Sequence, residues 1–144
     1  MRQGMQATRL TNLLIALAVA ALAACIPNPV EKSRGETFKQ YETIVRWSQW
    51  DAAADFIAPE YLVEHPITRL ELDRLRLFRV TAYTVRSTAM FDEGLTARRV
   101  VEVKLFNANQ AIERTIIDEQ EWRYHEDVKR WLLHSGLPDP TQRL

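Results

Sequence analysis

The sequence has a single cysteine, Cys25, among 144 residues, and this excludes an intrachain disulfide framework and a cysteine-rich zinc site. It has only four glycines, which stand far apart, so it contains no glycine-rich phosphate-binding loop. It has no excess charge, because 19 basic residues balance 19 acidic residues. A strongly basic, nucleic-acid-binding protein is therefore not expected. The length suits one folded domain, and 47% of the residues are hydrophobic.

The apolar run near the N-terminus, from Leu13 to Cys25, is too short to span a membrane. It has 13 residues, whereas a membrane-spanning helix needs about 20. Arg2 and Arg9 precede the run, small residues end it, and a proline at position 27 follows at once. Positive charge, a short apolar core and then small residues are typical of a secretory signal peptide.

The run ends in Leu22-Ala23-Ala24-Cys25, which resembles the lipobox of bacterial lipoprotein precursors. The resemblance implies cleavage before Cys25, so that residues 1–24 are the signal peptide. It also implies a thioether-linked diacylglycerol on the Cys25 sulfur and an acyl chain on the new amino terminus. Two or three chains would hold the protein firmly on a membrane. Because Ile26 rather than an aspartate follows the cysteine, analogy with enteric lipoproteins favours the outer membrane, facing the periplasm. An ordinary signal peptide with a chance cysteine is the alternative.

The remaining chain divides into a tether, a domain and a tail. Residues 26–36, which follow Cys25, contain two prolines, a glycine and mixed charge, a composition typical of a flexible tether. From Thr37 apolar residues recur at helical spacing, and a second short helix is expected after Asp51. A period of two then predicts four strands, over residues 75–85, 99–106, 111–124 and 130–134. Residues 138–144 are expected to form a polar tail.

Two hairpin registers follow from side-chain pairing. A loop over residues 107–110 would place Leu105 opposite Ile112 and create three opposite-charge pairs. Those pairs are Lys104–Glu113, Arg99–Asp118 and Arg98–Glu119. In the last hairpin, a loop over residues 126–129 pairs Tyr124 with Trp131 and Trp122 with Leu133. This pairing predicts one aromatic face that can pack on the helices.

The order of elements is similar to that of the NTF2-like (cystatin-like) family. The residues that carry the resemblance are Ser48 to Phe56 at the helix break, with Glu121 to Tyr124 and Arg130 to Leu133 in the last hairpin. The resemblance implies an α+β fold over residues 37–137, in which an N-terminal helix or helix pair packs on a curved four-stranded antiparallel sheet to form a cone. The family's usual glycine at the helix break is absent here. A compact antiparallel sheet of another topology is the alternative.

No motif in the sequence identifies a catalytic site. An isomerase-like site would need a carboxylate in a dry pocket and a donor for the developing oxyanion. The candidates are Asp55, Tyr61, His65 and Tyr83, but no pattern links them. A solvated aspartate and a core tyrosine are therefore the simpler interpretation.

Metal-ligating spacing is also missing from the sequence. His65, His125 and His134 have no partner histidine at helical spacing. Even if His125 and His134 share a face of the last hairpin, a third ligand is unassigned. No metal and no cofactor is therefore assigned from the sequence.

Four tryptophans, at positions 47, 50, 122 and 131, form a dense aromatic set that can serve as core, ligand pocket or interface. Trp47 and Trp50 cannot both point the same way as the apolar stripe of the preceding helix, so one of them is an interface candidate. Tyr61, between Pro59 and Pro66 in a lid or short helical turn, is another candidate.

The sequence thus predicts a lipid-anchored, non-catalytic envelope protein whose domain binds an envelope protein or a small apolar ligand. The NTF2-like resemblance leaves two alternatives open. One is an isomerase or lyase that acts on a small apolar substrate. The other is an assembly module of an envelope complex, which could form a homodimer through its open sheet face.

Overall fold

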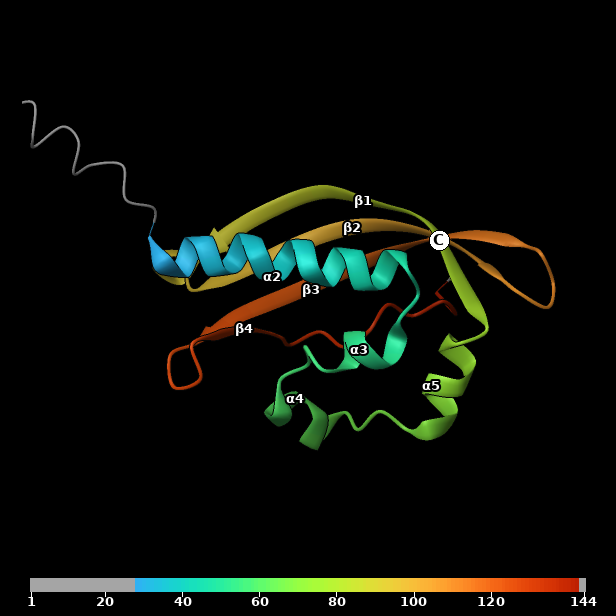
Figure 1. Ribbon diagram of the computed structural model, residues 1–144, viewed down its shortest axis with the longest axis horizontal. Coiled ribbons are helices and arrows are strands. Elements are labelled where there is room, and N and C mark those ends of the chain that lie inside the picture. Colours follow the sequence, from blue (N-terminus) through green and yellow to red (C-terminus); the bar gives the residue numbers. More distant parts are fainter. Residues whose placement is uncertain (1–27, 143–144) are drawn as a thin grey trace, which may run out of the picture.

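The computed structural model describes residues 28–142, so the predicted signal peptide and Cys25 lie outside the described residues. The described chain is α+β, and its four strands form one antiparallel sheet in the order β1-β2-β3-β4 (Figure 1). Its elements are α2 (Pro29–Arg46), α3 (Trp50–Ala54), α4 (Pro59–Glu64), α5 (Arg69–Leu75), β1 (Phe78–Phe91), the 3-10 turn η2 (Asp92–Gly94), β2 (Thr96–Asn107), β3 (Glu113–His125) and β4 (Arg130–Leu133). Among residues 28–142, no helix is both long and apolar enough to cross a membrane.

The first described helix, α2, begins earlier than the sequence predicts. Asn28 caps it by accepting a hydrogen bond from the Val30 N–H at 3.0 Å, and Pro29 occupies the first turn. Proline fits there because its missing N–H would have no partner in any case. The prediction of a flexible tether over residues 26–36 is therefore wrong for residues 29–36, which are helical.

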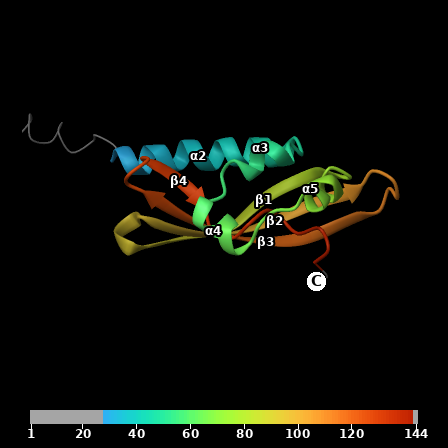
Figure 2. The ribbon, with the colours of Figure 1, turned by 90° about the horizontal axis from the view of Figure 1, so that it is seen from below.

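Helix α2 covers one face of the sheet, here called the inner face, through an aromatic cluster (Figure 2). The Tyr41 and Phe38 rings lie 5.0 and 5.3 Å from the Trp122 ring, and both Tyr41 and Trp122 are fully buried. Such tilted aromatic pairs stabilise a core beyond the area that they bury. The predicted packing of the aromatic hairpin against a helix is confirmed.

Both ends of α2 are tied to the sheet. Near its start, the Trp131 indole N–H donates to the Val30 carbonyl at 3.2 Å. After its end, Ser48 adopts a positive φ of 55°, and its hydroxyl accepts a hydrogen bond from the Val80 N–H at 2.9 Å. Ser48 thus adopts, at the end of the helix, a left-handed conformation that costs a non-glycine residue some conformational energy.

The last hairpin has the predicted register, whereas the one before it differs. Trp122 lies opposite Leu133 and Tyr124 opposite Trp131, as predicted. Between β2 and β3, however, Leu105 lies opposite Arg114 rather than Ile112, a shift of two residues. A shift of two leaves every side chain on its predicted face, so the alternation of apolar and polar residues could not detect it.

The three charge pairs predicted from that register are replaced. The residues opposite Lys104, Arg99 and Arg98 are a threonine, a glutamine and Glu121, respectively. Of these three opposing pairs, Arg98 and Glu121 form an ion pair, with Arg98 Nε 3.3 Å from Glu121 Oε2. The loop is longer than expected, because β3 begins only at Glu113 and Ala111 takes a positive φ of 51°.

Other boundaries also differ from the prediction, and the first strand runs on to Phe91 instead of ending at residue 85. The first strand begins at Phe78, because a capping box between Thr68 and Glu71 starts α5, which continues to Leu75. The predicted polar tail begins with two prolines, at positions 138 and 140, that are buried against the domain.

The aromatic core predicts a large difference between two tryptophan variants. Trp131 is 1% exposed and Trp47 is 75% exposed. We expect Trp131→Ala to lower the free energy of unfolding by about 3–5 kcal/mol because it leaves a cavity in the core. The matched variant Trp47→Ala should change it by less than about 0.5 kcal/mol. Urea titration followed by circular dichroism measures both, and equal losses would contradict the described packing.

Candidate functional site

A short parallel pairing between two distant segments fixes the position of α4. After α3, residues Phe56 to Ala58 run beside β4, and Ile57 forms a parallel bridge with Leu133. The Leu133 N–H donates to the Phe56 carbonyl at 2.7 Å, and the Ala58 N–H donates to the Leu133 carbonyl at 2.9 Å. Pro59 then starts α4 at once, so this pairing fixes α4 against the last hairpin.

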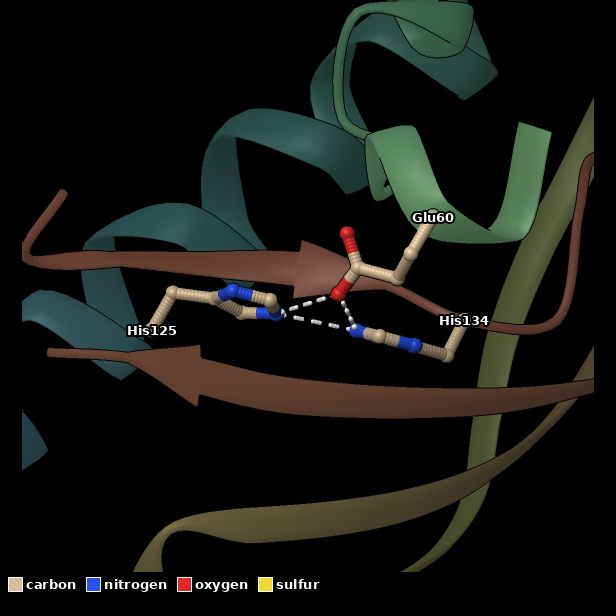
Figure 3. Close-up of side chains that lie close together, drawn as sticks. All are labelled: Glu60, His125 and His134. Carbon is tan, nitrogen blue, oxygen red and sulfur yellow. Dashed lines mark hydrogen bonds and ion pairs between the residues drawn. The ribbon is translucent and has the colours of Figure 1, made fainter. Parts of the chain in front are cut away.

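One consequence is a cluster of three side chains that converge from α4 and the hairpin (Figure 3). Glu60 lies in the first turn of α4, His125 ends β3, and His134 directly follows β4. The two Nε2 atoms lie 3.0 Å apart, and Glu60 Oε1 lies 3.3 Å from that of His125 and 3.6 Å from that of His134. The third group that the sequence left unassigned beside the two histidines is thus Glu60.

The cluster is buried at one end and open at the other. The side chain of His134 is 8% exposed, that of His125 is 22% exposed, and that of Glu60 is 54% exposed. Burial lowers the pKa of His134, the nearby charge of Arg123 lowers it further, and the charge of Glu60 opposes both effects. Burial and the charge of Arg123 thus favour the neutral form of His134, and a neutral imidazole has one ring nitrogen that can accept a proton or a cation.

A second consequence is a groove of about 590 Å³ between the helical segments α4–α5 and the C-terminal segment. The Tyr61 and His65 rings stack in it, with their centroids 4.5 Å apart and their planes 19° apart. Opposite them Gly136 adopts a positive φ of 77°, and a side chain there would start 3.2 Å from the Tyr61 hydroxyl. Ile67 and Leu137 add apolar surface. The structure thus brings together Tyr61 and His65, two of the four residues that the sequence offered as acid–base candidates.

The other catalytic candidates lie in different environments. Asp55 is exposed at the C-terminal end of α3. Tyr83 is 5% exposed on the inner face of β1, where its hydroxyl accepts a hydrogen bond from Gln120 Nε2 at 3.0 Å. These two residues therefore do not form the shared acid–base site that was considered from the sequence.

Tyr83 belongs to a polar network buried beneath α2 that the sequence analysis did not identify. Gln120 Nε2 also donates to Asp118 Oδ2 at 2.7 Å, and Arg99 Nη1 donates weakly to Gln120 Oε1 at 3.5 Å. Within residues 28–142, Arg99 Nε and the Tyr41 hydroxyl have no hydrogen-bond partner. Burial raises the pKa of Asp118 to about 6 and that of Tyr83 to about 12. The sequence pattern that could have predicted this network is the occurrence of Arg99, Asp118 and Gln120 at strand positions that alternate with the outward-facing ones.

The two tryptophan candidates differ in their exposure to solvent. Trp50 is 1% exposed, and its indole N–H donates to the Phe78 carbonyl at 3.2 Å. Trp47, in contrast, is 75% exposed after the end of α2. Only Trp47 of this pair is therefore placed to contact a partner.

The chain matches no family model, no curated protein and no solved structure.

The buried network predicts a pH dependence of stability. An aspartate in the unfolded chain has a pKa of about 3.9, whereas burial raises the pKa of Asp118 in the folded chain to about 6. The folded state therefore holds the proton more tightly, and ionising Asp118 costs stability as the pH rises through this window. Between about pH 4 and pH 8, Asp118 should thus lower the free energy of unfolding by about 2–3 kcal/mol.

Asp118→Asn tests this effect because an amide still accepts the Gln120 hydrogen bond but cannot ionise. The stability of Asp118→Asn relative to the wild type should increase as the pH rises, in urea titrations at several pH values. The matched variant Asp55→Asn, at an exposed position, should show no such trend. A constant difference between Asp118→Asn and the wild type at every pH would contradict the assigned pKa.

Proposed function

We propose that the protein is a lipid-anchored bacterial envelope lipoprotein, on the outer membrane and facing the periplasm, with a non-catalytic binding domain. The observation that carries the proposal is the Leu22-Ala23-Ala24-Cys25 motif, because the only cysteine of the chain stands at the end of a short apolar run. A thiol at that position is the group that lipid attachment requires. Such an anchor would make the membrane its first partner.

The early start of α2 supports a domain held close to the bilayer. Only residues 26–28 separate Cys25 from the first helical residue, and fully extended they would span roughly 10 Å. The start of α2 lies at the same end of the sheet as the β1–β2 and β3–β4 turns, whereas α5 lies toward the opposite end (Figures 1 and 2). In this arrangement the two turns would face the membrane, and the groove beside α5 would face the periplasm.

The NTF2-like family is the fold that we propose for this domain. A long helix lying across one face of a four-stranded antiparallel sheet supports it. So does the aromatic hairpin that packs against that helix.

The groove is the binding surface that we propose for an envelope protein or a small apolar ligand. Its stacked Tyr61 and His65 rings, with Ile67 and Leu137, offer a mainly apolar wall with a few polar atoms, as ligand sites usually do. The separate environments of Asp55 and Tyr83 support a non-catalytic role.

One observation favours the isomerase or lyase alternative. Asp118, whose pKa is raised to about 6, lies with Tyr83 in a buried polar network, as the acid–base groups of such enzymes often do. This alternative would require α2 to move away, because α2 covers the face on which the network lies.

The homodimer alternative would use the outer face of the sheet, which carries the ion pairs Arg86–Glu102 and Arg98–Glu121.

Lipid attachment is tested by metabolic labelling with an alkyne analogue of palmitate in a bacterial host. The wild-type chain should incorporate the label and lose residues 1–24, as measured by mass spectrometry of the purified protein. Cys25→Ser should incorporate none, because serine offers no thiolate for alkylation. An unlabelled wild-type chain whose Cys25 thiol is free would contradict the proposal.

The groove is tested by photocrosslinking in intact cells. We expect a photoreactive phenylalanine analogue at position 65, which lines the groove, to capture a specific neighbour that mass spectrometry can identify. The same analogue at position 69, whose arginine side chain is 94% exposed outside the groove, is the matched control. Identical crosslinking patterns at the two positions, or none at position 65, would contradict a binding role for the groove.

A further inference from the structure

We propose that Glu60, His125 and His134 form a binding site for a Zn²⁺ ion, held between α4 and the β3–β4 hairpin. This proposal goes beyond the lipid anchor and the groove, and it depends on neither of them. Two imidazoles and one carboxylate are a ligand set that zinc uses in proteins, usually with a fourth position left for water or another ligand. The inference depends on how these three side chains converge (Figure 3).

The distances between the three ligand atoms suit a tetrahedral ion. Zinc bonds of about 2.0–2.2 Å to nitrogen and oxygen place neighbouring tetrahedral ligand atoms roughly 3.3 Å apart. The three observed separations are 3.0, 3.3 and 3.6 Å, between the two Nε2 atoms and Glu60 Oε1. An ion about 2 Å from each atom would lie slightly above their plane. The open side of the triangle would then hold the fourth ligand.

Hydrogen bonding alone accounts poorly for this convergence. A neutral imidazole carries a proton on one ring nitrogen only, and an ionised carboxylate carries none. The two Nε2 atoms and Glu60 Oε1 therefore have few protons to share among three mutual contacts. A cation at the centre would satisfy all three lone pairs at once.

The backbone holds the three residues in place before any ion binds. The His134 N–H donates to the Glu121 carbonyl at 2.7 Å, and the Ala58 N–H, just before α4, donates to the Leu133 carbonyl. Strand alternation places Leu132 on the same face as His134, and Leu132 is only 7% exposed. Such preorganisation reduces the entropy that binding must overcome.

The charges around the site permit a cation. Arg123 is the nearby cation that lowers the pKa of His134. Its guanidinium is held by Glu121 Oε1, at 2.5 and 2.9 Å, so a carboxylate compensates its charge. Glu60 contributes a negative charge at the site itself, and its exposed side chain leaves a path for the ion from solvent. Mg²⁺ and Ca²⁺, which prefer oxygen ligands, should not bind here.

The test is a Zn²⁺ titration of the full chain, purified in detergent and stripped of metal with a chelator. Competition with a chromogenic zinc indicator measures the affinity and the stoichiometry. We expect one Zn²⁺ per wild-type chain. Losing groups that merely support a ligand weakens metal sites by about 10–100-fold, so His125→Ala and His134→Ala should each weaken binding by about 100-fold or more. His65→Ala removes the remaining histidine, which is exposed outside the cluster, and should bind as the wild type does.

Two further variants keep the test decisive. Glu60→Gln alters an exposed side chain, so it should preserve the fold even if His134→Ala does not, and it should weaken binding by about tenfold or more. With Co²⁺ in place of Zn²⁺, the wild type should show the strong visible absorption of a tetrahedral ion, and Glu60→Gln should change it. Cys25→Ser should bind Zn²⁺ normally, which separates this proposal from lipid attachment.

The proposal is overturned by any of three results. The first is the absence of saturable binding by the wild type. The second is unchanged affinity in the folded Glu60→Gln and His125→Ala variants. The third is loss of binding in His65→Ala or Cys25→Ser, because the ion would then be held elsewhere in the chain.

Discussion

The pairing of residues Phe56 to Ala58 with Leu133 is the interaction on which the groove and the histidine cluster depend. Its two backbone hydrogen bonds, of 2.7 and 2.9 Å, join segments that are far apart in the sequence. It also covers the edge of the short strand β4, which would otherwise expose unpaired backbone groups. Because α4 starts immediately afterwards, the same pairing directs Glu60 toward the histidines and places Tyr61 beside Gly136. Loss of this pairing would therefore disrupt the groove and the histidine cluster together.

The domain has two polar clusters, and their burial suits them to different roles. The network of Tyr83, Gln120, Asp118 and Arg99 is sealed under α2, and none of the four residues is more than 7% exposed. Buried networks of this kind act on stability and on the uniqueness of the core. The cluster of Glu60 and the two histidines opens to solvent through Glu60 and can exchange an ion with it. Accessibility, more than residue type, thus separates the site that we propose from the structural network.

Local patterns in the sequence predicted much of the fold, and non-local contacts explain what they missed. The aromatic alternation of the last hairpin gave its register correctly, because one face had to be buried. The capping box of Thr68 and Glu71 is a sequence pattern that marks the start of α5. The start of α2 was missed because Pro29, which was interpreted as part of a tether, occupies the first helical turn. His125 and His134 could be placed on one hairpin, whereas Glu60 reaches them through a parallel pairing that no local spacing encodes.

X-ray absorption spectroscopy of the zinc-loaded full chain would test the central claim most directly, because it measures the atoms bound to the ion. Two imidazole nitrogens and carboxylate oxygen should appear at about 2.0–2.2 Å, with the outer-shell scattering of two histidine rings. A shell of oxygen alone would contradict the account. So would sulfur at about 2.3 Å, which would place the ion on a cysteine instead of at the hairpin.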